Sequence, residues 1–216
     1  DIGMIANSII YDVLKHFGYN ESALNMVVGI LSDNLFPTIV MQGDLMTIPA
    51  LQPSGKYATA EDNTLRGLIM LLYFWISEVS DENIKDEDFF SYVLPKIYGD
   101  DVVASVKEEV QDVFNNVTYQ KFCSKVYGID YTSASKSSEM EPFLIFDDIS
   151  FLKRSFIFNP ELNHWVAQLN PDSLMKTICY YLPSKVVTMQ EQVMDASVSC
   201  MRELFFYDSP INYEMR

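Results

Sequence analysis

The sequence predicts an α+β protein with a β-rich middle and a helical final third. In its first 35 residues, and again from about 58 to 78, apolar residues recur at helical spacing. Between about 93 and 158, short apolar runs alternate with glycine and polar turns, which is typical of strands. Because 49% of the 216 residues are hydrophobic, the chain can also bury a substantial core.

The elements expected in the first half follow from periodicity and from the residues that end each run. In order, they are a helix over 2–17, a helix over 21–35, a hairpin over 38–49 with its turn at Gly43-Asp44, a tight loop over 52–55 and a long helix over 58–78. Since the long helix is apolar on most sides, we expect it to be central and largely buried.

The second half is expected to continue with strands and then helices. In order, these are a hairpin over 93–106 with its turn at 99–101, a helix over 110–127, a short strand over 129–132, a β segment over 149–158, and helices after 159 that break at Pro160, Pro171 and Pro183. The helical part is interpreted as a smaller subdomain, which gives predicted domains of 1–158 and 159–216.

Charge and cysteine content limit the classes of function. A formal net charge of −15 argues against a surface that coats nucleic acid generally, because such surfaces use Lys and Arg to neutralise phosphates. The three cysteines form neither a disulfide framework nor a Cys-x-x-Cys metal pattern. No apolar run reaches the roughly 18 residues that a membrane span requires.

The sequence Tyr98-Gly99-Asp100-Asp101 places two adjacent carboxylates at the tip of the second predicted hairpin. Like charges at this distance repel one another, and a divalent cation removes that cost. Magnesium prefers oxygen ligands and commonly lies between carboxylates and substrate phosphates. The pattern therefore indicates part of a metal site, although Gly-Asp-Asp is also an ordinary polar turn.

A second polar group lies at the start of the long predicted helix. Thr59 and Asn63 stand four residues apart, so both face the same side of the helix, and Ser54-Gly55 forms the loop before it. Such a pair can hydrogen-bond a sugar hydroxyl or a base edge. Alternatively, Ser54 caps the helix and the other two side chains bond nearby backbone groups.

These motifs together resemble those of the RNA-directed RNA polymerases of picornavirus-like positive-strand RNA viruses. Ser54-Gly55-x3-Thr59-x3-Asn63 is similar to the second motif of that family, and Tyr98-Gly99-Asp100-Asp101 to the third. The segment 132–137, with Lys136, resembles the fourth motif, and the segment 149–154, with Phe151-Leu152-Lys153-Arg154, resembles the fifth. All four occur in the family's order.

The resemblance implies a partial polymerase palm over 1–158, which is an antiparallel sheet with helices, and a partial helical thumb over 159–216. It also implies roles for the residues: metal binding by Asp100 and Asp101, proton donation to pyrophosphate by Lys136, ribose and template contact by Ser54, Gly55, Thr59 and Asn63, and primer holding by Phe151, Leu152, Lys153 and Arg154.

The implied enzyme is a nucleotidyltransferase that copies an RNA template with Mg²⁺, for which Mn²⁺ is a substitute. Its implied partners are RNA template and primer, nucleoside triphosphates and other viral replication proteins. The implied location is the host cell cytoplasm, at viral replication complexes. Lys56 and Arg66 are weaker candidates for contact with template or triphosphate.

The first motif of the family, an aspartate that follows a strand, is not found in this sequence. We therefore expect that motif and the fingers to lie upstream of Asp1, and we expect residues 1–216 alone to be inactive. Two alternatives remain open at this point. One is a reverse transcriptase-like polymerase, which the Ser-Gly-x3-Thr-x3-Asn pattern disfavours, and the other is a noncatalytic acidic α+β interaction domain.

Overall fold

The computed structural model describes residues 2–49, 51–52, 55–56, 58–133 and 139–207. The chain divides into two compact units, Asp1–Tyr131 and Thr132–Arg216. Both contain helices and antiparallel strands, so the predicted α+β class is confirmed. The division at Tyr131 differs from the palm and thumb boundary placed after residue 158, which stays a prediction. None of the described helices is long and apolar enough to cross a membrane.

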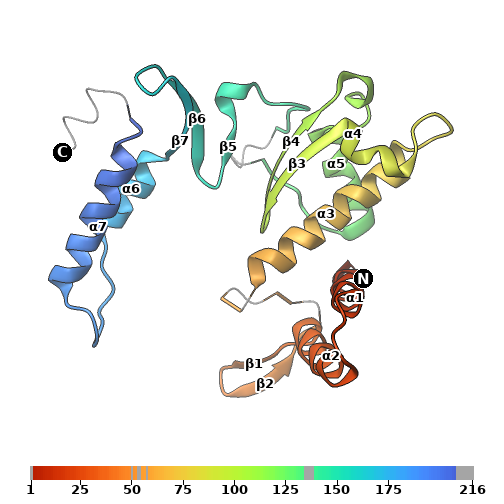
Figure 1. Cartoon of the computed structure of the whole chain (residues 1–216), viewed down its shortest axis with the longest axis horizontal. Coiled ribbons are helices and arrows are strands. Elements are labelled where there is room, and N and C mark those ends of the chain that lie inside the picture. Colours follow the sequence, from red (N-terminus) through yellow and green to blue (C-terminus); the bar gives the residue numbers. More distant parts are fainter. Residues whose placement is uncertain (1, 50, 53–54, 57, 134–138, 208–216) are drawn as a thin grey trace. The chain divides into compact units, whose positions relative to one another are not determined.

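The first unit is built around one long helix (Figure 1). Its elements are α1 (Ile2–His16), α2 (Glu21–Leu35), β1 (Thr38–Met41), β2 (Asp44–Thr47), α3 (Thr59–Glu78), α4 (Phe89–Tyr92), β3 (Val93–Tyr98), β4 (Asp101–Val106) and α5 (Asn116–Phe122). Helix α1 packs against both α2 and α3, and strand β3 packs along α3. The helices over 2–16 and 21–35 and both hairpins were predicted from the sequence.

The core of this unit lies beneath the C-terminal half of α3. Trp75 and Phe74 are almost completely buried there. The Phe74 ring lies 5.1 Å from Phe114 and 5.0 Å from Phe122, and the Trp75 ring lies 5.6 Å from Phe89. Large buried aromatic side chains contribute much of the apolar area removed from water. This core fixes the end of α3 that is remote from Thr59 and Asn63.

Three sequence predictions in this unit need correction. The first hairpin turns at Gln42-Gly43, one residue earlier than predicted, since Met41 pairs with Asp44. The helix after the second hairpin begins only at Asn116, because the Asn115 side chain accepts hydrogen bonds from two backbone amides there. No strand forms over 129–132, where the Tyr131 carbonyl instead accepts a hydrogen bond from Gln120.

The second unit is a three-stranded antiparallel sheet followed by two packed helices (Figure 1). Its elements are β5 (Ser150–Phe151), β6 (Arg154–Asn159), β7 (His164–Leu169), α6 (Pro171–Cys179) and α7 (Met189–Leu204). The predicted β segment over 149–158 is confirmed. Helix α7 begins with a capping box formed by Thr188 and Glu191. Leu174, Cys200, Leu204 and Tyr207 form its small core.

Strand β7 contradicts the helix that was predicted after residue 159. It pairs with β6 from Phe158 opposite Trp165 to Arg154 opposite Leu169. Val166 and Gln168 are buried while Trp165 is exposed, which is the two-residue alternation of a strand. The buried Gln168 side-chain amide donates a hydrogen bond to the Phe206 carbonyl at 2.6 Å. This polar side chain therefore has a hydrogen-bond partner although it is buried.

Candidate functional site

The two predicted metal-binding carboxylates lie at the tip of the β3–β4 hairpin. Tyr98 pairs with Asp101, so Gly99 and Asp100 form the two-residue turn. Gly99 has φ of 63°, a left-handed value that glycine adopts without steric cost. Asp100 and Asp101 are both exposed. Their carboxylate oxygens are accessible, and hard cations such as Mg²⁺ prefer such ligands.

This tip is attached to helix α3. The Gly99 amide donates to the Thr64 hydroxyl at 2.9 Å, and that hydroxyl donates to the Ala60 carbonyl at 2.7 Å. Further along, a Cβ placed on Gly67 would lie 3.4 Å from Ile97, so helix and strand pack closely. Thr64 was not among the site residues predicted from the sequence. The one sequence feature that pointed to it was its position directly after Asn63.

The start of α3 carries the predicted nucleotide-contacting residues that the structure describes. The Thr59 hydroxyl donates to the Lys56 carbonyl at 2.6 Å, as the capping alternative expected. Asn63 lies four residues later on the same face and is half-buried. Its contact with a nucleotide stays a prediction. Gly55 has φ of 85° with open space around it, and Ser54 lies outside the described residues.

Arg66 and Lys56 are not exposed, unpaired cations of the kind that would bind a phosphate. The Arg66 guanidinium donates twice to Asp62, at 3.0 Å each, and Gln52 donates to the same carboxylate at 2.9 Å. The Lys56 ammonium is buried without a hydrogen-bond partner, and burial lowers the pKa of this group. Asp62 therefore links Gln52 to α3, and the Arg66 guanidinium is engaged in an ion pair within the helix.

The predicted primer-holding segment forms the turn between β5 and β6. Phe151 pairs with Arg154, and Leu152 and Lys153 form the turn with φ of 54° and 59°. Neither turn residue is glycine, so each carries steric strain in this left-handed conformation. The Asn170 amide donates to the Lys153 carbonyl at 2.8 Å, while the Lys153 side chain is exposed. The exposed Lys153 ammonium is accessible to a phosphate group.

Arg154 is bound within the second unit. Its guanidinium donates to both Glu203 oxygens, at 2.8 and 2.7 Å, and to the Ala167 carbonyl at 2.8 Å. These hydrogen bonds raise the pKa of Arg154 and hold the pKa of the Glu203 carboxyl below its usual value. Arg154 thus ties the turn to α7, and contact with a primer stays a prediction for it.

The remaining metal and catalytic predictions are only partly described. Lys136 lies outside the described residues. Within residues 2–49, 51–52, 55–56, 58–133 and 139–207, no three His, Cys, Asp or Glu side chains are grouped to hold a metal ion. Asp100 and Asp101 fit a hard cation by their chemistry and exposure, but supply only part of a coordination shell.

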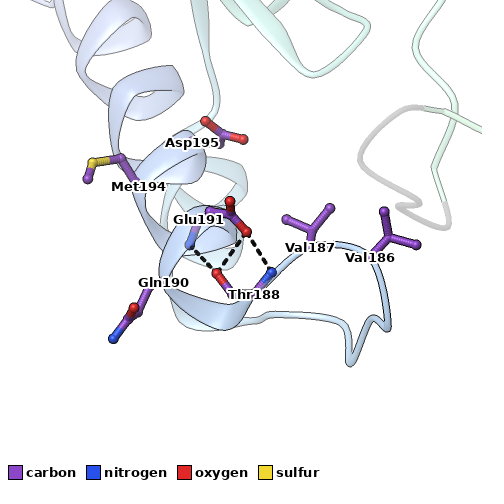
Figure 2. Close-up of a pocket in the computed structure, with 7 residues that line it drawn as sticks. All are labelled: Val186, Val187, Thr188, Gln190, Glu191, Met194 and Asp195. Carbon is purple, nitrogen blue, oxygen red and sulfur yellow. Dashed lines mark hydrogen bonds between the residues drawn. The ribbon is translucent and has the colours of Figure 1, made fainter.

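A hollow of about 630 Å³ lies at the start of α7 (Figure 2). None of the residues that line it is a predicted site residue. Figure 2 shows the Glu191 carboxylate directed at Thr188, whose backbone amide and hydroxyl both donate to it at 2.8 Å. These bonds lower the pKa of Glu191. Because they complete a capping box, the Thr188 and Glu191 groups in this hollow already have a structural role.

Comparison of the sequence with known proteins gives the family of this chain. The model of the family "Viral RNA-dependent RNA polymerase" matches residues 33–212. The replication polyprotein of Nora virus is 35% identical over 103 residues, which cover 48% of this chain and 5% of that protein. The genome polyprotein of Deformed wing virus is 26% identical over 180 residues, which cover 82% of this chain and 6% of that protein.

A solved sicinivirus 3Dpol RNA-dependent RNA polymerase superposes with a TM-score of 0.69 at 17% identity, covering 88% of this chain and 36% of that one. This likeness shows that the chain has the fold of part of a viral polymerase. The chain spans under a tenth of the polyproteins named above and about a third of the solved polymerase. The matched range includes all four predicted motifs, and the chain belongs to the viral RNA-dependent RNA polymerase family.

Proposed function

We propose that this chain supplies the metal-binding turn, the nucleotide-contacting helix and the primer-holding turn of an enzyme that copies RNA from nucleoside triphosphates. One observation carries the proposal beyond family membership. The exposed Asp100 and Asp101 lie on a turn that is hydrogen-bonded to α3, the helix that bears Thr59 and Asn63. The chain thereby joins a carboxylate pair to the helix that bears Asn63 within one compact unit.

In this proposal, Asp100 binds magnesium directly and Asp101 assists it electrostatically or as a second ligand. Bound metal ions supply charge stabilisation to the attacking and leaving oxygens of nucleotidyl transfer. Mn²⁺ can substitute because it accepts the same oxygen ligands. The Asp100 and Asp101 carboxylates are accessible to a cation, since both residues are exposed.

The other residues act on RNA and on the nucleotide. The Asn63 amide contacts the ribose or the template, with Ser54, Gly55 and Thr59 forming the rest of that surface. The Lys153 ammonium binds the primer backbone as a point charge on an exposed turn. Lys136 donates a proton to the leaving pyrophosphate. Phe151 is the strand residue that pairs with Arg154 across the primer turn, and Leu152 precedes Lys153 within that turn.

Residues 1–216 by themselves are expected to be inactive, because the first motif of the family is not found among them and the chain spans only 36% of the solved polymerase. We therefore place the complete reaction in a longer polymerase that contains the first motif. Its substrates are an RNA template, a primer and nucleoside triphosphates, and its setting is a viral replication complex in the host cytoplasm with other viral replication proteins. Immunolocalisation in infected cells, with nuclear-only staining as the contrary result, tests the setting.

The test of the reaction uses the polymerase extended upstream of Asp1. Asp100→Asn removes a metal-binding charge and keeps the side-chain shape, so we expect primer extension to fall by about a hundredfold or more. The matched control is Asp86→Asn, which makes the same change at an exposed carboxylate remote from the turn in sequence. Undiminished extension by the Asp100→Asn enzyme contradicts the proposal.

A further inference from the structure

The hydroxyl of Thr64 is the point at which α3 holds the tip of the β3–β4 hairpin. Gly99 and Thr64 are 35 residues apart, and the Gly99 amide lies 2.9 Å from the hydroxyl oxygen. Gly99 is the first residue of the two-residue turn, immediately before Asp100. A change in this one contact therefore moves the backbone from which the carboxylates extend.

The direction of both hydrogen bonds at this hydroxyl follows from chemistry alone. A carbonyl cannot donate, so the Thr64 hydroxyl must donate its proton to Ala60. A backbone amide cannot accept, so Gly99 must donate to a lone pair of the hydroxyl oxygen. The hydroxyl is thus held by the helix in the one orientation that receives the turn.

The position of Thr64 in the sequence connects this contact to the nucleotide-contacting residues. Thr64 directly follows Asn63, and Thr59 lies one turn earlier on the same helix. The helix that presents the nucleotide-contacting side chains therefore also positions the metal-binding turn. We propose that Thr64 is a positioning residue that sets Asp100 and Asp101 relative to Thr59 and Asn63, an inference that rests on the proposed function.

The contact is suited to positioning rather than to stability. Gly99 is only partly buried, so water can replace the lost partner when the hydroxyl is removed. The Ala60 carbonyl lies in helix α3 and keeps its helical backbone bond. The main core of the unit lies around Trp75, more than two helical turns further along α3. Removal of the hydroxyl should leave the fold intact and the turn misplaced.

The test compares two substitutions at Thr64 in the upstream-extended polymerase. Thr64→Val keeps the β-branched shape without the hydroxyl, and we expect the kcat of single-nucleotide incorporation to fall about tenfold. The magnesium concentration for half-maximal rate should rise about threefold or more. The nucleotide KM should change less than kcat does. Thr64→Ser keeps the hydroxyl and should restore both values to near those of the unmodified enzyme.

The matched control is Thr177→Val. The Thr177 hydroxyl also donates to the carbonyl four residues earlier in its helix, at 2.9 Å, but no hydrogen bond from a described residue outside α6 reaches it. This variant should keep the kcat and magnesium dependence of the unmodified enzyme. Equal behaviour of Thr64→Val and Thr177→Val overturns the proposal, as does equal impairment of Thr64→Val and Thr64→Ser.

A second variant covers the case in which Thr64→Val does not fold. Thr64→Cys is close in volume and offers only a weak acceptor, so it should lower kcat by a smaller factor. Full activity of Thr64→Cys then overturns the proposal. Asp100→Asn in the same assay separates the two claims: an inactive Asp100→Asn enzyme beside an active Thr64→Val enzyme rejects the positioning role alone.

Discussion

Two hairpin turns carry charged side chains predicted to belong to the functional site. Their conformations are stabilised in different ways. In the acidic turn at Gly99-Asp100 the left-handed residue is a glycine, and the Gly99 amide donates one neutral hydrogen bond to the Thr64 hydroxyl. The basic turn at Leu152-Lys153 has two left-handed residues that are not glycine. Each such residue costs about 1 kcal/mol or more, so this turn needs support from outside itself.

That support comes from the rest of the second unit. The Asn170 amide binds the Lys153 carbonyl, and the Arg154 guanidinium binds Glu203 on α7. The conformation of the acidic turn is therefore set largely by its own residues, although a distant side chain, Thr64, contacts it, whereas the conformation of the basic turn depends on contacts with distant residues. The acidic turn should therefore respond most to a change in its own backbone, and the basic turn to changes far along the chain.

The largest effect is expected from removal of the Arg154 guanidinium. Arg154→Ala deletes three hydrogen bonds and leaves Glu203 without its partner, so the free energy of opening β6 and β7 should fall by about 2 kcal/mol. Native-state hydrogen exchange of the β6 and β7 amides measures it. Arg202→Ala removes the same charge from an exposed neighbour of Glu203 and should change little. Equal effects would refute the tertiary support.

The same ion pair predicts a dependence on pH. Hydrogen bonding to Arg154 depresses the pKa of Glu203 from its ordinary value of 4.5, so the stabilisation is present above that value. It is lost as the pH falls below 4.5 and through the depressed pKa. Glu203→Gln keeps the shape and removes the titration. A stability profile below pH 4.5 that is equally steep with and without Glu203→Gln contradicts the assignment.

A smaller effect is expected at the acidic turn. Gly99→Ala adds a Cβ that meets open space but must adopt φ of 63°, so opening of β3 and β4 should become easier by about 1 kcal/mol. Gly29→Ala is the matched control, because Gly29 lies in the interior of α2, also with open space, and has no positive φ. It should stabilise its helix. Destabilisation by both would point to crowding instead of backbone strain.

The smallest effect is a gain in stability at the basic turn. Asparagine tolerates the left-handed region better than leucine, so Leu152→Asn should make β5 and β6 harder to open by about 0.5 kcal/mol. Leu162→Asn is the matched control, since Leu162 is 43% exposed against 40% for Leu152 and has no positive φ. A gain at both positions would show that relief of strain is not the cause.

The same contrast explains which features were predictable from the sequence. Gly99-Asp100-Asp101 is typical of a turn, so the β3–β4 hairpin and its exposed tip were predicted from a few adjacent residues. The partner of Arg154 lies 49 residues away and that of Gly99 lies 35 residues away, so no local pattern indicates either contact. Arg154 was accordingly read as a primer contact, without its bond to Glu203.

Strand β7 was missed for a related reason. Gln168 is polar and the segment follows Pro160, so the alternation of Val166 and Gln168 did not resemble a buried strand face. The Gln168 side chain is satisfied by the Phe206 carbonyl, which only the folded chain supplies. The family, in contrast, was recognisable because its motifs are short and occur in a fixed order.

The most direct measurement of the central claim is primer extension by the upstream-extended polymerase with Asp100→Asn, beside Asp86→Asn, across a range of magnesium concentrations. Asp86→Asn is expected to retain full activity, while Asp100→Asn loses about a hundredfold or more at every concentration. Full extension by the Asp100→Asn enzyme would show that the exposed Asp100-Asp101 pair is only a polar turn.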